Sequence, residues 1–271
     1  MIRTLLILAG LALSACTTPA PVERRAAPDI ELPPMKTFGA PRSTRPQRSN
    51  RSIAKDIIDL SFRLESGREL PVLTRFEGPI TVRVVGPAPN SLSTDLDRLI
   101  KRMRNEAGLR ITRVPANAEA SITIEVLTRR DLQRAVPQAA CFVVPRITSW
   151  AEFKRNRRSA QLDWTTLRVR ERMAIFLPGD VSPQEVRDCL HEELAQAIGP
   201  LNDLYRLSDS VFNDDNFHTV LTGFDMLVLR TLYAPELRSG MTREQVAARL
   251  PGILARLNPA GRSAADSAGG A

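Results

Sequence analysis

Alternating apolar and polar residues mark several short stretches in the middle of the chain as β-strands. Residues 80–85 are the clearest case, because they alternate and are mostly β-branched, a composition that favours extended backbone. In residues 172–177 an apolar run follows Arg172, and Pro178 and Gly179 end it. The predicted strands cover residues 80–85, 109–114, 120–127, 141–147 and 172–177.

Apolar residues three and four positions apart predict helices between and after these strands. The clearest helix starts at Ser182, a capping residue that is followed by Pro183 and, three positions after the serine, by Glu185. The predicted helices cover residues 53–64, 91–108, 182–199, 225–233 and 242–257. Elements in this order predict an α+β domain in which a mixed sheet packs on two helices, with further helices at the C-terminal end.

The start of the chain predicts export and lipidation. Residues 1–15 combine a basic start, a short apolar run and small residues, which is typical of a signal peptide and too short for a membrane span. Cys16 follows Leu-Ser-Ala, so this segment resembles a bacterial lipobox and predicts a lipid anchor on Cys16; an incidental cysteine after a simple signal peptide is the alternative. Because Thr17 is not the aspartate that retains such lipoproteins at the inner membrane, we expect the outer membrane, facing the periplasm.

Composition divides the rest of the chain. Residues 16–52 repeat proline, arginine and alanine without a hydrophobic period, which predicts a disordered tether. Residues 53–258 are expected to form one domain, and residues 259–271 a disordered tail. A net charge of +8 usually suggests nucleic acid, but export removes most nucleic acid from reach, so we expect no such partner. The basic run 154–158 indicates attraction to anionic lipid or lipopolysaccharide, or simply a solvated surface.

Two cysteines remain in the predicted mature domain, Cys141 and Cys189. Thiols in an oxidising periplasm more often pair than stay free, which predicts a disulfide between them. The bridge would tie a segment in the middle of the domain to the start of the helix that follows Ser182. Two buried free thiols are the alternative.

That helix resembles the metal-binding helix of the matrixin branch of the metzincins, a class of zinc proteases. Its frame there is H-E-x-x-H-x-x-G-x-x-H, whereas this chain has Glu192, Glu193, Gln196, Gly199 and Asn202 at the corresponding places. The glutamate and the glycine are kept, but the three histidines are replaced. The resemblance implies a zincin-like fold with Glu193 at the position of the catalytic base.

Two later segments extend the resemblance. Residues 209–212 fall where matrixins have a methionine turn, with Phe212 in place of the methionine, and residues 221–233 are similar to the matrixin closing helix. A closer likeness covers most of residues 75–245, through Cys189, the Glu192 frame, the Ser210 segment and the residues from Leu221 to Met241. These motifs resemble a family of unknown function found in putative bacterial lipoproteins, domain of unknown function two-nine-two-seven. That likeness implies no known reaction.

The residues at the histidine positions are poor zinc ligands. Glu192, Gln196 and Asn202 offer one carboxylate and two amide oxygens, whereas zinc prefers imidazole and thiolate. With Asp203 nearby the set could hold a divalent cation such as calcium or manganese weakly, and no other cofactor is indicated. A hydrogen-bonded polar network that fixes the helix to the following loop is the alternative, and the two adjacent glutamates also leave a glycosidase open.

The positions of residues around the helix predicted at 182–199 restrict the roles that Glu193 and His191 can have. Leu190, Leu194 and Ile198 share an apolar stripe, which leaves Glu193 at its half-buried margin. A frame that starts at His191 would need a ligand at Ala195, so we expect His191 to make an ordinary hydrogen bond. The sequence therefore favours a non-catalytic or structural module that binds an envelope protein or peptide; the alternative is a metal-dependent peptidase with Glu193 as general base.

Overall fold

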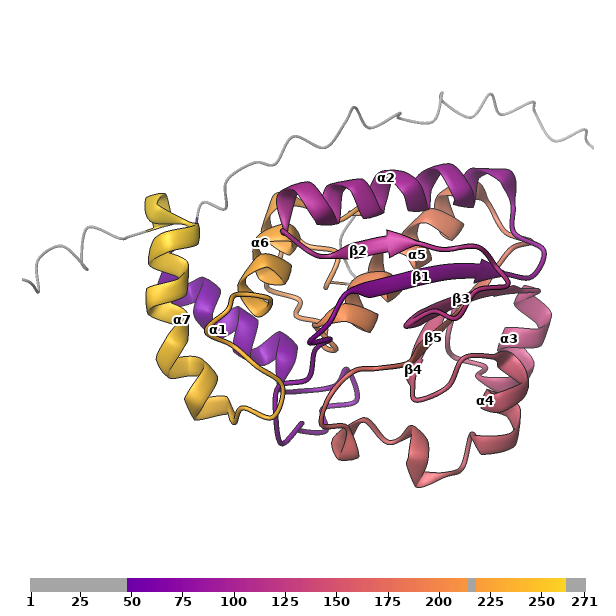
Figure 1. Ribbon diagram of the computed structural model, residues 1–271, viewed down its shortest axis with the longest axis horizontal. Helices are drawn as coiled ribbons and strands as arrows, with labels where there is room; N and C mark the ends of the chain where they lie inside the picture. Colours follow the sequence, from indigo (N-terminus) through magenta and orange to yellow (C-terminus); the bar gives the residue numbers. More distant parts are fainter. Residues whose placement is uncertain (1–47, 214–217, 262–271) are drawn as a thin grey trace, which may run out of the picture. The chain divides into compact units, whose positions relative to one another are not determined.

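The structure is a computed structural model that describes residues 48–213 and 218–261. Within these ranges five strands form one sheet in the order β2-β1-β3-β5-β4 (Figure 1). All strand pairs are parallel except β4 with β5, which is antiparallel, so β2 and β4 are the edge strands. The strands are β1 (Ile80–Val85), β2 (Ile111–Arg113), β3 (Ile122–Leu127), β4 (Phe142–Pro145) and β5 (Met173–Pro178).

The described ranges also contain seven α-helices, some of which lie beside the sheet rather than over it (Figure 1). They are α1 (Asn50–Ser61), α2 (Asn90–Glu106), α3 (Arg129–Ala135), α4 (Trp150–Asn156), α5 (Pro183–Ile198), α6 (Gly223–Leu232) and α7 (Arg243–Leu257). Short 3₁₀ turns follow at Ala160–Leu162, Trp164–Thr166 and Pro259–Gly261. The prediction of a mixed sheet with helices and further C-terminal helices is confirmed. The sheet is mostly parallel, so the domain is of a mixed α/β type rather than the predicted α+β type. Every predicted strand and helix is present, residues 80–85 with the predicted bounds and the others with shifted ends.

Strand β5 shows how the two faces of the sheet are covered. All six of its residues are buried. Met173, Ile175 and Leu177 belong to the main core under α2 and α5, while Ala174 and Phe176 belong to a smaller core with residues of α3 and α4. A sheet buried on both faces gives a continuous apolar strand.

Helices α3 and α4, which cover the second face, were not predicted. Each has only seven residues, about two turns, which is too short for a repeated apolar stripe to be visible. Both helices nevertheless carry a cap signal. The Thr128 hydroxyl accepts a hydrogen bond from the backbone of Asp131, and the Ser149 hydroxyl accepts one from the backbone of Glu152.

The two ends of the described chain meet. Helix α1 packs against α7, and the side chain of Asn50 donates to the carbonyl oxygen of Asn258 at 3.1 Å. In return the side-chain nitrogen of Asn258 donates to Oδ1 of Asn50 at 3.0 Å. Residues 50–52, predicted as tether, therefore belong to α1, and the predicted tail begins with the 3₁₀ turn Pro259–Gly261.

The predicted leader, the lipidation site Cys16 and most of the predicted tether lie outside the described residues. A search of the described helices finds none that is long and apolar enough to cross a membrane.

The predicted disulfide is confirmed: Cys141 and Cys189 are bonded, with their Cα atoms 5.9 Å apart. Cys141 immediately precedes β4, and Cys189 lies in the second turn of α5. The bond therefore holds the edge strand of the sheet to the helix that carries the Glu192 frame.

Candidate functional site

Helix α5 positions most of the candidate residues. The Ser182 hydroxyl accepts a hydrogen bond from the backbone of Glu185 at 3.2 Å, and Pro183 occupies the first turn, as the sequence predicted. Gly199 ends the helix. A Cβ atom there would lie 2.8 Å from a methyl group of Leu232, so the glycine allows α6 to approach the end of α5 closely.

A cavity of about 660 Å³ opens between α5, the edge strand β4 and the loops beside them. Phe142 and Val143 of β4 line one side, and Trp164 adds an aromatic wall. Polar side chains of α5 line the other side. The lining residues with carboxylate or amide groups are Glu65, Gln138, Glu192, Glu193 and Gln196.

Three carboxylates form a cluster, and two of them, Glu65 and Glu192, line this cavity. One oxygen each from Glu65, Glu192 and Asp203 lie within 4.8 Å of one another. Gln196 connects two of them, because its Nε2 donates to Oε1 of Glu65 at 2.8 Å and lies 3.4 Å from Oε1 of Glu192. The structure therefore brings together Glu192, Gln196 and Asp203 of the predicted set and adds Glu65.

No local pattern in the sequence marks Glu65, so it was not among the predicted site residues. It lies in the loop after α1, 131 positions before Gln196, and only the packing of α1 near the end of α5 brings the two together. The carboxylates that could face a cation thus come from three separate segments.

Asn202 does not join this cluster. Its side-chain nitrogen donates to the carbonyl oxygen of Asp59 at 3.1 Å, near the C-terminal end of α1. A helix leaves its last carbonyl groups without partners inside the helix, so Asn202 fixes the loop after α5 to α1. The structure therefore separates the third position of the predicted frame from Glu192 and Gln196.

Glu193 is more buried than the margin position predicted for it. Its relative exposure is 4%, although it lines the cavity. Gln196, on the opposite side from the apolar stripe, is also buried at 6%. Helix α5 is covered on several sides because it packs against α2 as well as β4 and β5. The apolar stripe alone could not predict this second layer of contacts.

A buried arginine that the sequence analysis did not single out fixes the C-terminal end of α5. Arg170 donates to the carbonyl oxygens of Gln196 and Gly199, the latter at 2.6 Å, and a positive charge there complements the helix dipole. Its Nε also donates to the Thr74 hydroxyl at 3.1 Å. Burial lowers the pKa of Arg170 to about 10, so the side chain stays charged at neutral pH.

His191 points away from the cavity and makes an ordinary hydrogen bond, as predicted. Its Nδ1 accepts from the backbone N–H of Leu221 at 3.1 Å. Burial, followed by the charges of Arg102 and Arg187, lowers its pKa to about 3. The chain has two histidines, and the second, His218, contacts the carbonyl oxygen of Ser208. Neither lines the cavity, so imidazole coordination of zinc does not fit this site.

The segment predicted to form a turn next to the metal helix supports α6. The buried carboxylate of Asp225 accepts hydrogen bonds from the Ser210 hydroxyl at 2.5 Å and from the backbone of Val211 at 3.2 Å. Asp225 also forms a reciprocal capping box with Thr222, and Phe212 is fully buried. These motif residues therefore hold the start of α6.

The fold and the site define an α/β domain with an acidic cavity beside an edge strand. The family model described as "Protein of unknown function (DUF2927)" matches residues 50–252, and the chain belongs to this family. No curated protein matches the chain. The family boundaries coincide at the N-terminal side with the first residue of α1.

Proposed function

We propose that the domain is a non-catalytic module that binds an extended peptide segment of a cell-envelope partner. The observation that carries the proposal is the cavity beside β4. Strand β4 has a neighbouring strand on one side only, and a free strand edge offers backbone groups with which an extended peptide can pair.

The lining of the cavity favours a particular peptide. Phe142 and Trp164 offer apolar surface, while Glu65 and Glu192 offer negative charge close by. A segment with an apolar residue next to a lysine or arginine would match both. The disulfide and Arg170 support the proposal because they fix the two walls before any ligand arrives, which lowers the entropy lost on binding.

Titration of a peptide library against the domain tests this function. The best peptide should carry a basic residue, and Glu65→Arg should weaken it at least about tenfold, since it reverses a charge at the site. The matched control is Glu119→Arg, an exposed glutamate that does not line the cavity. Equal binding by both variants, or the absence of any basic preference, would refute the proposed site.

A second function, hydrolysis of the bound peptide with a divalent cation, is favoured by the carboxylate cluster. Three carboxylates fit a hard cation such as Ca²⁺ or Mn²⁺ better than zinc. A cation supplies Lewis acidity when bound, and Glu193, which lines the same cavity, would take the proton of an attacking water. Gln196 counts against this function, because it directs an N–H toward Glu65 and Glu192.

Metal content distinguishes the two functions. Protein purified without chelator should be metal-free, and its melting temperature should not respond to chelator, if the cluster is a polar network. One equivalent of metal that is lost in both Asp203→Asn and Glu65→Gln, but kept in Glu119→Gln, would favour the peptidase.

The scaffold itself, we propose, is zincin-like and lacks the zinc histidines. The support is a mixed sheet with an antiparallel edge strand and a helix that carries Glu192, Glu193 and Gln196 beneath that edge. For location we propose an outer-membrane lipoprotein that faces the periplasm, anchored through Cys16. The disulfide is compatible with that oxidising compartment. Palmitate labelling that disappears in Cys16→Ser tests the anchor.

A further inference from the structure

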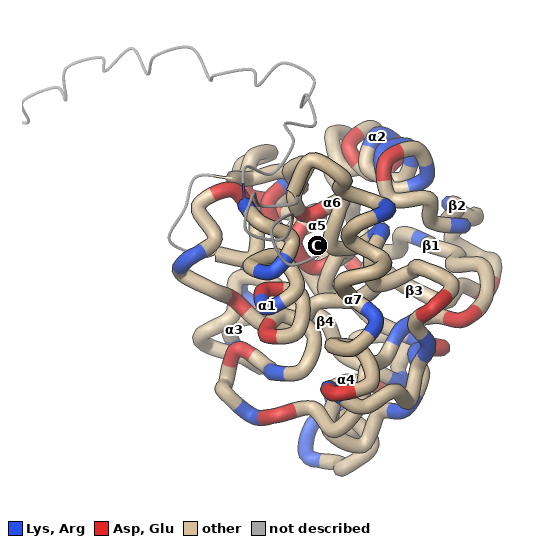
Figure 2. The backbone as a smooth tube through the Cα atoms, turned by 90° about the vertical axis from the view of Figure 1, so that its left-hand side faces the viewer, with Lys and Arg blue, Asp and Glu red and all other residues tan. Residues whose placement is uncertain are grey.

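The chain between β4 and β5 concentrates positive charge. Residues 146–172, called here the basic lobe, contain eight Lys and Arg and three Asp and Glu, a net charge of +5 out of +8 for the chain. The lobe includes α4 and the two 3₁₀ turns that follow it. Figure 2 shows blue segments at the lower end of the molecule, around α4.

Two of the three acidic residues in the basic lobe are engaged inside the protein. Glu152 accepts a hydrogen bond from the backbone of Thr148 at 2.7 Å. Asp163 pairs with Arg68 at 3.0 Å and caps the turn at Thr165. Glu171 is the third acidic residue, and it is exposed. Two of the three carboxylates in the basic lobe therefore do not neutralise its exposed lysine and arginine side chains.

The basic residues behave differently, since six of them are exposed and none makes a side-chain hydrogen bond or ion pair with the described residues. They are Lys154, Arg155, Arg157, Arg158, Arg168 and Arg172. Elsewhere in the described ranges arginines commonly pair with carboxylates, as Arg102 does with Glu106 and Arg206 with Asp56. Unpaired cations gathered on one lobe raise the local positive potential.

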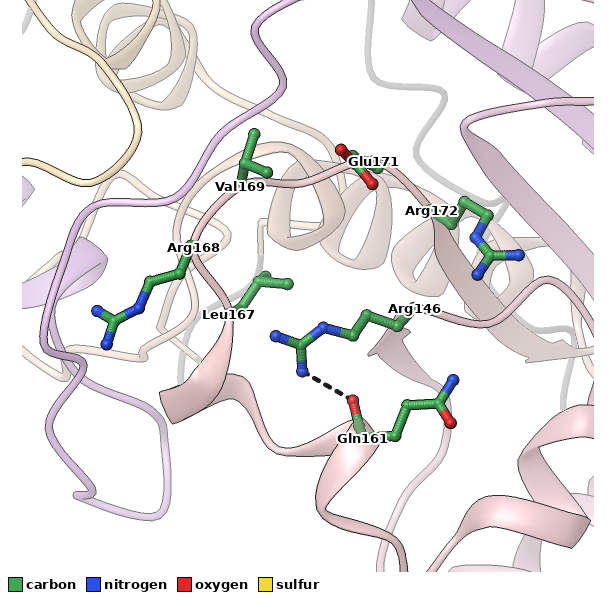
Figure 3. A pocket seen from close by; sticks show the side chains of 7 residues that line it. All are labelled: Arg146, Gln161, Leu167, Arg168, Val169, Glu171 and Arg172. Atoms are coloured by element: carbon green, nitrogen blue, oxygen red, sulfur yellow. Dashed lines mark hydrogen bonds between the residues drawn. The ribbon is translucent and has the colours of Figure 1, made fainter.

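A pocket of about 270 Å³ hollows this surface, lined by Arg146, Arg168 and Arg172 together with Gln161 and Glu171. Figure 3 shows the guanidinium of Arg146 between the other two arginines, which extend to either side. Arg146 is held in place because it donates to the carbonyl oxygen of Gln161 at 2.9 Å. Glu171 also lines the pocket, and Figure 3 shows its carboxylate across the pocket from the guanidinium of Arg146.

The backbone of Arg146 is also unusual. It has a φ of 66°, in the left-handed region that non-glycine residues rarely adopt. Its N–H donates to the carbonyl oxygen of Arg172 at 2.7 Å, and its guanidinium donates to the carbonyl oxygen of Thr166 at 2.7 Å. These contacts tie the two ends of the basic lobe together around the pocket.

We propose that the basic lobe docks the domain on a bilayer surface that carries anionic phospholipid. Guanidinium groups bind phosphate oxygens in paired hydrogen bonds, and the pocket between Arg168 and Arg172 offers room for a headgroup phosphate. Six unpaired cations on one lobe complement a sheet of negative headgroups, where each basic group contributes attraction. The sequence predicts a lipid anchor at Cys16, which would keep the lobe beside such a surface.

The docking is electrostatic and involves no insertion of apolar side chains. Tyr205 is the exposed large hydrophobic residue of the described ranges, and it lies outside the basic lobe. Without an apolar wedge, attraction to the headgroups is screened by salt. The binding is therefore reversible and sensitive to ionic strength. Trp164 of the lobe also lines the cavity beside β4, so docking would hold that cavity close to the bilayer.

Vesicle co-sedimentation tests the proposal with the chain from residue 16 onward carrying Cys16→Ser, so that no lipid anchor contributes. The chain should bind vesicles with about one third phosphatidylglycerol and ignore pure phosphatidylcholine vesicles. Replacing Arg155, Arg157 and Arg158 by Gln should weaken binding about 100-fold, at roughly fivefold per basic group. A second variant, Arg168→Gln with Arg172→Gln, tests the pocket and should lose about 20-fold or more.

The matched control replaces Lys101, Arg104 and Arg110 by Gln. These residues are exposed, lie on or after α2 and make no side-chain contact with the described residues, so the net charge falls equally. The control should change binding by less than about threefold. Equal losses in control and lobe variants, or binding unchanged between about 50 and 500 mM salt, would overturn the proposal. Retention on duplex DNA without vesicle binding would also overturn it.

Discussion

The disulfide between Cys141 and Cys189 should contribute a large part of the stability of this domain. It joins residues 48 positions apart. A cross-link stabilises mainly by restricting the unfolded chain, and a loop of this length corresponds to about 4 kcal/mol at 25 °C. We therefore expect the double variant Cys141→Ala with Cys189→Ala to lose about 4 kcal/mol of unfolding free energy.

Urea unfolding followed by tryptophan fluorescence measures this loss, since Trp150 and Trp164 both lie near β4. With a urea dependence of about 2 kcal/mol per molar, the unfolding midpoint should fall by about 2 M. Wild-type protein treated with reductant is the control and should unfold at the midpoint of the double variant. Agreement between the two would show that the lost cross-link, rather than the lost sulfur atoms, causes the change.

Two results would refute the reasoning. One is a double variant within about 1 kcal/mol of the oxidised protein, because the loop constraint would then contribute little. The other is a titration of the unfolded, unreduced chain that finds two thiols at Cys141 and Cys189. A reduced domain that stays folded should also bind its peptide more weakly, because the bond joins the two walls of the cavity.

Three further predictions concern single residues. Arg170→Met should cost about 3 kcal/mol, because it leaves buried carbonyl groups without a donor, whereas exposed Arg168→Met should be almost neutral in urea unfolding. The contribution of His191 to stability should be full above about pH 6.5 and should be lost as the pH drops toward 3, because the fold accepts only the neutral imidazole. Comparing the pH dependence of urea unfolding for the wild type and His191→Gln isolates this contribution, and identical profiles would contradict this origin. Gly86→Ala should lower the free energy of unfolding by more than about 2 kcal/mol, because φ is 88° and a Cβ would overlap a backbone carbonyl of β3. Gly108→Ala, at φ 70° in open space, should lower it by only about 1 kcal/mol. Equal losses in the two variants would refute the overlap.

Local patterns predicted the elements of this fold because they depend on neighbouring residues. The alternation in β1 and the cap at Ser182 are each contained in a few positions, and both elements form where the sequence indicates. The disulfide was predictable for a different reason, since Cys141 and Cys189 are the two cysteines of the described chain. The short helices α3 and α4 were not predicted because two turns are too short to show a hydrophobic period.

The cavity was less predictable because its residues meet only through tertiary packing. The helical frame correctly put Glu192 near Gln196, one turn apart, but it could not indicate that Glu65 would approach from the loop after α1. It also could not indicate that the side chain of Asn202 would donate a hydrogen bond to the carbonyl oxygen of Asp59. Arg170 carried no motif, and only its burial under the end of α5 shows its importance.

The contact between Asn50 and Asn258 joins two residues that are synthesised at different times. The two residues are 208 positions apart, so α1 is among the first parts of the domain to be synthesised and its partner α7 is the last. At about 5–20 residues per second, α1 waits roughly 10–40 seconds before Asn258 exists. During that interval Ile53 and Ile57, which are fully buried in the finished domain, are without α7. A chaperone that binds the apolar face of short amphipathic helices would therefore meet α1 first on the nascent chain.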